Sequence, residues 1–361
     1  MLLKVKRAFK YFTFGIFVVY ILLEAFARIF KGENMALANF PKIYTPDTVV
    51  GYRGIPYAKG YIRRPSIKKE FVLNNQGFFG PDFYPEHPDS IYRIMVFGTS
   101  SVEGIWGDNT ESFPATMNRL FKAAGYKVEV INCGLSGGFR SLFNVALIRQ
   151  MASVYKPDLV LFESPIPISN ATCYRDIYRG YSITFTGENR AEREHSRGLT
   201  RKKVDLVQEH GLITDLYDMS YLVRFWARQQ EDELGTASHT CRIYAKNCCD
   251  NWQYFSSLTT KSFEESIRMI NGLQEELGQM HTTLALFEYG NSELGNKIRK
   301  SPAKFSFISL DLPLGDEKYR LPHDGHTNAQ GYAIMAEGLC KTVKQQYLPA
   351  RFFPQRNLSM K

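Results

Sequence analysis

The chain has 361 residues, a formal net charge of +9 and 44% hydrophobic residues. Its length suits one domain of about 250 residues with appendages, and no internal repeat is visible. No nucleic-acid-binding motif accompanies the positive charge, so we expect that charge to attract anionic lipids or an acidic polysaccharide instead.

Residues 1–31 have the pattern of a membrane-addressing segment. Four cations (Lys4, Lys6, Arg7 and Lys10) precede an uncharged apolar run at residues 11–23. A helix continued through Phe30 would be about 30 Å long, enough to span a bilayer. Glu24 and Arg28 would then lie one helical turn apart and could pair.

The positive flank predicts a cytoplasmic amino terminus, with the remainder of the chain in the periplasm or outside the cell. An uncleaved single-pass anchor is favoured. The alternatives are a signal peptide cleaved near Ala25-Phe26-Ala27 and a buried amphipathic helix. Residues 32–90 follow as an exit segment with scattered Pro and Gly and a turn at residues 74–77.

An apolar strand at residues 93–97 runs into the turn Gly98-Thr99-Ser100. Such a turn presents a hydroxyl at the carboxyl edge of a parallel sheet, which makes Ser100 a candidate nucleophile. A serine hydroxyl is weakly nucleophilic at neutral pH. It therefore needs a base, and that base needs a third group to fix its tautomer.

Helices and strands alternate through the rest of the domain, which we place at residues 91–345, before a basic tail at 346–361. Helices are expected at 112–124, at 142–154 and from a capping box at Ser262 to a stop at Gly278. Strands are expected at 128–131, 158–162, 282–287 and 305–310. This alternation predicts an α/β fold of three layers, with helices on both faces of a mostly parallel sheet.

An insertion at about residues 171–257 interrupts that rhythm, where a lid over a substrate would lie. It is rich in Tyr and Arg, which could bind sugars. For Leu222, Phe225 and Trp226 in its apolar island, a small helical core is the favoured interpretation.

Asp324 and His326 precede an amphipathic run at residues 329–343 and supply the two missing residue types. Two other interpretations exist. Asp324-Gly325 could be a simple turn, with Asn328 capping the next helix. His323, Asp324 and His326 could bind a metal, but no further ligand lies at suitable spacing nearby, so we predict no metal and no cofactor.

Together these motifs resemble the SGNH (GDSL-type) hydrolase family, in particular bacterial membrane-anchored SGNH-domain proteins. The matching residues are Gly98, Ser100 and Gly104 in the first block and Asp324, His326 and Gly331 in the last. The resemblance implies a Ser100 nucleophile, a His326 base and an Asp324 that orients it. A second block at residues 128–137 implies that the Gly137 backbone N–H binds the oxyanion.

The chain departs from the family pattern at two positions. Thr99 replaces the aspartate of the first block, which removes a carboxylate that usually braces the turn. Pro167 stands where the third block has an oxyanion-binding asparagine, and proline has no N–H to donate. Asn170 would replace that asparagine if the loop bulges back; Ser164 or Ser169 are other possible donors.

By resemblance, the chain is a serine esterase or O-acyltransferase acting on O-acyl groups, such as acetyl, of cell-envelope carbohydrate. A membrane-bound O-acyltransferase is a partner that the resemblance implies for some members. The competing hypothesis is a catalytically weak or inactive SGNH-fold binding or scaffold protein in an envelope-polysaccharide assembly. Thr99 and Pro167 favour it, whereas Ser100, Asp324 and His326 oppose it.

The six cysteines divide into two groups. Cys133 and Cys340 fall in expected core elements and are predicted to be free and buried. The other four lie in the insertion and, if exported, could form one or two disulfides: Cys173, Cys241, Cys248 and Cys249.

Overall fold

The structure is a computed structural model. It describes residues 2–31, 43–47, 51–64, 67–86, 88–104, 111–135, 141–166, 168, 174–179, 181–185, 190–203, 216, 220–223, 262–290, 292–321 and 326–354. Asp324, Gly137, Asn170, Pro167 and the four cysteines of the insertion lie outside these ranges.

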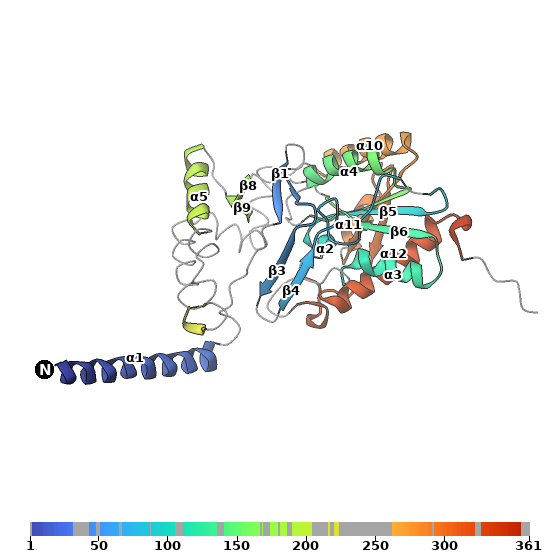
Figure 1. Cartoon of the computed structure of the whole chain (residues 1–361). Helices are drawn as coiled ribbons and strands as arrows, with labels where there is room; N and C mark the ends of the chain where they lie inside the picture. Colours follow the sequence, from blue (N-terminus) through green and yellow to red (C-terminus); the bar gives the residue numbers. More distant parts are fainter. Residues whose placement is uncertain are drawn as a thin grey trace, which may run out of the picture.

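Five parallel strands form the central sheet, in the order β11-β10-β7-β5-β6 (Figure 1). They are β5 (Tyr92–Phe97), β6 (Val128–Asn132), β7 (Leu159–Glu163), β10 (Thr283–Tyr289) and β11 (Ser306–Leu310). The inner strands β7 and β10 are largely apolar and buried, as expected for a parallel sheet covered on both faces. The predicted strands and the parallel sheet are confirmed.

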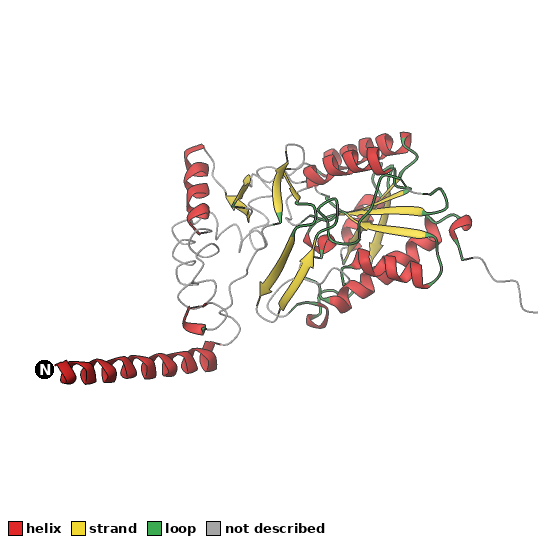
Figure 2. Ribbon diagram, viewed as in Figure 1, coloured by secondary structure: helices red, strands yellow, loops and turns green. Residues whose placement is uncertain are grey.

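Helices cover both faces of this sheet, which gives the predicted three layers (Figure 2). On one face, α3 (Phe113–Ala123) and α12 (Ala329–Gln346) pack on Ile94 and Val96 of β5. On the other face, α4 (Ser141–Tyr155), α10 (Phe263–Gln279) and α11 (Ser292–Arg299) pack on a core that includes Met95 and Phe97. Successive side chains of β5 therefore point to opposite faces of the sheet and pack in two different hydrophobic cores.

The helix ends follow local sequence signals, with one exception. The capping box of α10 forms as predicted: Ser262 accepts from the Glu265 N–H, and the Glu265 carboxylate accepts from the Ser262 N–H. The predicted stop at Gly278 is wrong. The helix continues to Gln279, and the left-handed residue after it is His281, with φ of 60°.

The exit segment forms two hairpins that the sequence analysis did not predict. They pair β1 (Tyr44–Asp47) with β2 (Gly51–Gly54) and β3 (Lys59–Arg64) with β4 (Ile67–Val72). Phe71, Leu73 and Phe78 are buried in the core that α4 and α10 share. These residues of the segment therefore pack in the same core as the helices of the domain. Within the insertion, β8 (Tyr174–Tyr178) pairs with β9 (Tyr181–Phe185), and α5 spans Arg190–Lys203.

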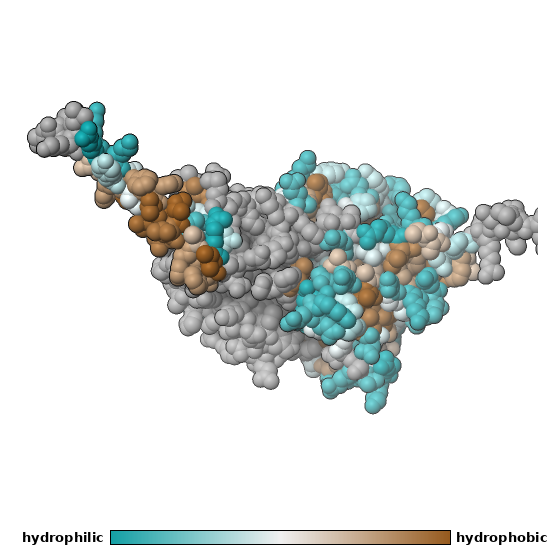
Figure 3. Space-filling model, turned by 90° about the horizontal axis from the view of Figure 1, so that it is seen from below, coloured by the Kyte–Doolittle hydropathy of each residue, from teal (hydrophilic) through white to brown (hydrophobic). Residues whose placement is uncertain are grey.

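The amino-terminal helix α1 (Leu2–Lys31) projects from the rest of the chain (Figure 1). Hydrophobic residues cover much of its surface (Figure 3). Among the described residues, one stretch is long and apolar enough to cross a membrane, Val5–Phe30 of this helix. The length and composition of this helix are compatible with a membrane anchor, and a signal sequence would have the same properties. The predicted Arg28–Glu24 pair forms, with Nε and Oε1 3.0 Å apart.

Candidate active site

Ser100 and His326 meet at the carboxyl edge of the sheet. Ser100 is the first residue of a short helix, α2 (Ser100–Glu103), which begins shortly after β5 ends. His326 precedes α12, and its Nε2 lies 2.9 Å from Ser100 Oγ. Both side chains are partly buried. The structure thus brings together a serine and a histidine that the sequence separates by 226 positions.

The absence of a side chain at Gly98 lets the strand turn sharply into α2. A Cβ at this position would lie 2.3 Å from Val102 Cγ2 and 2.6 Å from Glu163 Oε2. The turn is then closed by backbone bonds from Val102 and Glu103 to the Thr99 carbonyl. Gly98 is therefore needed for close packing around the candidate nucleophile.

His326 is held by the loop that leads into α12. The His326 carbonyl accepts from the Leu321 N–H at 2.9 Å, and Thr327 forms a bridge with Arg320. Asn328 caps α12 by accepting from the Gly331 N–H at 3.0 Å. Asn328 therefore caps α12 while His326 contacts Ser100, so the two interpretations are compatible. The cap also fixes the backbone two residues after His326.

The second block lies beside the first. The Leu135 N–H donates to the Gly98 carbonyl at 3.1 Å, and Asn132 Nδ2 donates to the Glu103 carbonyl at 3.1 Å. A Cβ on Gly134 would lie 2.2 Å from the Glu103 nitrogen, so this approach too requires glycine. Residues 132–135 thus run next to the Ser100 turn.

Three predicted site residues lie outside the described part of the chain: Asp324, Gly137 and Asn170. Their roles as orienting carboxylate and oxyanion donors stay predictions. Of the alternative donors, Ser169 is also outside, whereas Ser164 is described. The Ser164 N–H is bonded to the Phe287 carbonyl, and its buried hydroxyl has no partner among the described residues.

The turn around Ser100 does have a bracing carboxylate, contrary to the expectation drawn from Thr99. Glu163, the last residue of β7, accepts at Oε2 from the Thr99 N–H at 2.7 Å and from Thr99 Oγ1 at 2.8 Å. The carboxylate comes from the neighbouring strand instead of from the turn itself. The sequence signal for it was a single acidic residue at the end of an apolar run.

Tyr289, the last residue of β10, extends this group of contacts. Its hydroxyl donates to Glu163 Oε1 at 2.7 Å and is hydrogen-bonded to the side chain of Ser101. Burial, and next the nearby Glu163 charge, raise the pKa of Tyr289 well above its usual range, so the phenol stays protonated as a donor.

The two described cysteines are free and buried, as predicted, and lie in the core. Burial raises the pKa of the Cys340 thiol to about 12 and that of Cys133 well above its usual range. Both are therefore neutral near pH 7 and are not nucleophiles. No group of three or more potential metal-ligating His, Cys, Asp or Glu occurs among the residues that the structure describes.

A cavity of about 330 Å³ lies between the outer edge of β6, α3 and the loop that follows β4. Asn74, Asp82, Arg119 and Glu129 are among its lining residues, but Ser100 and His326 are not. It is thus distinct from the Ser100–His326 pair, and we do not assign it to the candidate active site.

No family model matches the chain, and no curated protein matches it. Among solved structures, one similar to the chain is that of TesA, at 11% identity and a TM-score of 0.37, covering 70% of this chain and 98% of TesA. Another is a Bacteroides fragilis protein named for a proposed acylhydrolase activity, at 12% identity and a TM-score of 0.32, covering 73% of this chain and 90% of that protein.

At these TM-scores neither similarity bears on the chemistry of this chain. Its own features are a five-stranded parallel sheet, helices on both faces, and Ser100 and His326 in contact at the carboxyl edge. These features fit the α/β fold of the SGNH hydrolases that the sequence motifs resemble.

Proposed function

We propose that this protein is a serine hydrolase of the SGNH type that acts on ester bonds. The observation that carries the proposal is the 2.9 Å contact between Ser100 Oγ and His326 Nε2. A nucleophile and a base within hydrogen-bond reach are the minimum requirement for covalent acyl transfer.

In the proposed reaction, Ser100 Oγ attacks the ester carbonyl carbon while His326 takes the hydroxyl proton. The tetrahedral intermediate collapses, the ester bond breaks, and His326 returns the proton to the departing alcohol. Water then attacks the acyl-enzyme with His326 again acting as base, which releases the acid and restores Ser100. Asp324 would orient the imidazole, and Gly137, with Asn170 or Ser164, would bind the oxyanion.

The proposed substrates are O-acyl groups, such as acetyl, of cell-envelope carbohydrate. The resemblance to anchored SGNH-domain proteins and the apolar helix α1 support this choice. If a sugar hydroxyl replaces water in the second step, the same site is an O-acyltransferase. We place the domain on the periplasmic or extracellular side, with the amino terminus in the cytoplasm and a membrane-bound O-acyltransferase as a candidate partner.

The test uses the full chain in detergent, a fluorophosphonate probe and p-nitrophenyl acetate. Ser100→Ala is compared with Ser153→Ala, which removes an exposed hydroxyl on α4. We expect labelling and acetate release in the wild-type and Ser153→Ala proteins but not in Ser100→Ala. If the wild type shows neither activity, the enzyme proposal fails, and the binding or scaffold hypothesis takes its place.

A further inference from the structure

The turn at residues 98–100, which follows β5, lies beside the end of β7, although β6 comes between these two strands in the chain. β5 lies between β6 and β7, with Phe97 opposite Phe162 in the parallel register. The connection from β5 to β6 runs through α3 on one face, and the connection from β6 to β7 runs through α4 on the other. β5 and β7 therefore flank the point where the strand order reverses, which is where α/β sheets place their sites.

Glu163 spans this point and joins the turn to Tyr289. Oε2 accepts both donors of Thr99, and Oε1 accepts the Tyr289 hydroxyl. Tyr289 in turn is hydrogen-bonded to Ser101. The residues immediately before and after Ser100 are thus both tied to one carboxylate, directly or through one phenol.

The packing leaves this carboxylate little freedom. A Cβ at Gly98 would lie 2.7 Å from the Glu163 Cβ as well as 2.6 Å from Oε2. The absence of a side chain at Gly98 therefore leaves room for the Glu163 side chain as well as for the turn. Because charged hydrogen bonds are stronger than neutral ones, three donors on one carboxylate hold the turn more firmly than backbone bonds alone would.

We propose that Glu163 is a positioning residue for Ser100. It fixes Thr99 directly and Ser101 through Tyr289, so that Ser100 Oγ stays in line with His326 Nε2. It acts without touching the substrate. The inference rests on the proposed function, because the position of Ser100 matters only if Ser100 reacts.

The experiment compares Glu163→Ala, Glu163→Gln and Tyr289→Phe with Glu288→Gln. Glu288 is also a buried carboxylate near the end of β10, but it accepts from the Ser309 hydroxyl of β11. For each full-length protein we would measure the rate constant of fluorophosphonate labelling at Ser100, kcat and KM for p-nitrophenyl acetate, and the unfolding temperature.

We expect Glu163→Ala to lower kcat and the labelling rate by about 100-fold, with KM changed much less, since a displaced nucleophile reacts slowly without binding substrate more weakly. Glu163→Gln should recover about tenfold of that loss, because its amide oxygen can still accept from Thr99. Tyr289→Phe should lose about tenfold and Glu288→Gln nothing.

Several outcomes would overturn the inference. If the folded Glu163 variants are labelled at the wild-type rate, or only the unfolding temperature falls, Glu163 is structural. If Glu163→Ala does not fold, unchanged kcat in both Glu163→Gln and Tyr289→Phe leads to the same conclusion. If the wild type is not labelled, the proposed function fails and this inference fails with it. If the wild type is labelled but the Glu163 variants react at the same rate, only this inference fails.

Discussion

The Glu24 carboxylate of α1 accepts a hydrogen bond from the Ser220 hydroxyl, 196 residues further along the chain, at 2.9 Å. It also accepts from the N–H groups of Tyr221, at 2.7 Å, and Leu222, at 3.1 Å. Arg28 completes the contact by stacking over the Tyr221 ring, 4.9 Å from its centroid. The acid that follows the apolar run of α1 is thus hydrogen-bonded to the start of a helical turn in the insertion.

Replacing Glu24 by Ala should release residues 220–222 of the insertion from α1. Two backbone N–H groups and a hydroxyl would lose their acceptor, at a cost of about 1–3 kcal/mol. We expect limited proteolysis within the insertion to become about tenfold faster in detergent. Lys10→Ala, at the other end of α1, is the control. Equal cleavage of both variants would show that this contact does not hold the insertion.

Gly98→Ala should damage the domain, because the new methyl group would overlap Val102 and Glu163. We expect a loss of about 2–4 kcal/mol in the free energy of unfolding, together with loss of Ser100 labelling. Gly272→Ala is the control: it lies inside α10, and a Cβ there would have nothing within 4 Å. That change should instead stabilise the protein by about 0.5–1 kcal/mol. Denaturant unfolding measures both; equal effects would contradict the packing argument.

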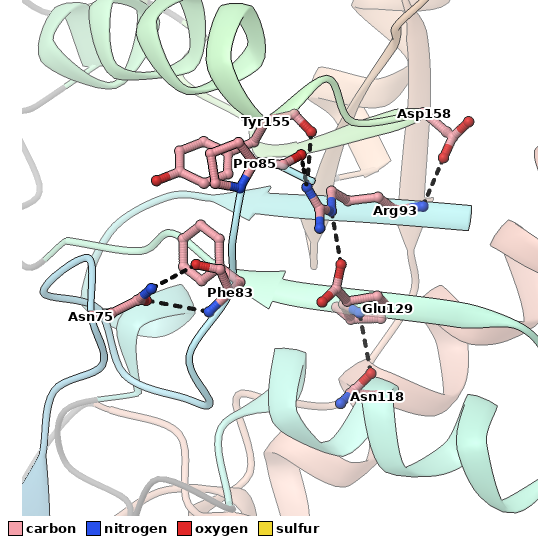
Figure 4. A network of polar contacts seen from close by, with 9 residues as sticks. Asn75, Phe83, Pro85, Arg93, Asn118, Glu129, Tyr155 and Asp158 are labelled. Carbon is pink, nitrogen blue, oxygen red and sulfur yellow. Dashed lines mark hydrogen bonds and ion pairs between the residues drawn. The ribbon is translucent and has the colours of Figure 1, made fainter. Parts of the chain in front are cut away.

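The stability of the fold around the buried guanidinium of Arg93 should depend on its ion pair with Glu129. Arg93 is 2% exposed, and its Nε lies 2.7 Å from the Glu129 carboxylate, which is 33% exposed (Figure 4). Two carbonyls, of Pro85 and Tyr155, accept from the same side chain. A double-mutant cycle of Arg93→Met and Glu129→Gln should give a coupling of about 1–3 kcal/mol, since removing Glu129 alone leaves a buried charge.

The exposed ion pair of Arg149 and Glu276 provides the control for that cycle. Both side chains are nearly half exposed, so water screens their attraction. We expect a coupling of at most about 0.5 kcal/mol from the same measurement. A coupling as large as that of Arg93 and Glu129 would show that burial is not what distinguishes the two pairs.

Stability should fall at alkaline pH, partly through Cys340. Burial raises the pKa of its thiol from 9.0 to about 12 in the folded protein. The unfolded chain therefore loses this proton first, so the contribution is complete below pH 9 and is lost as the pH rises toward 12. In Cys340→Ala the decline should be shallower, by up to about 1.4 kcal/mol per pH unit. An unchanged slope, relative to Ser153→Ala as control, would contradict the assignment.

Local sequence patterns predicted the repeating elements of the fold. Apolar runs form β5 and β7 because a strand buried on both faces needs no polar side. Ser262 and Glu265 form the capping box of α10 through contacts between residues three positions apart. The serine and histidine were predictable because acyl transfer requires both chemical types. The orienting aspartate and the oxyanion donors lie outside the described residues and stay predictions.

Glu163, Tyr289 and the hairpins of the exit segment were not predicted, for one physical reason. Glu163 reaches Thr99 only because β7 lies next to β5, although β6 comes between them in the chain. The exit segment joins the core only because Phe71 and Leu73 meet side chains contributed by α4 and α10. The sequence by itself thus determined the elements of the central sheet and the residue types of the candidate site, through local pattern and chemistry. Tertiary structure alone decided which distant side chains support them, because strand order and packing bring those groups together.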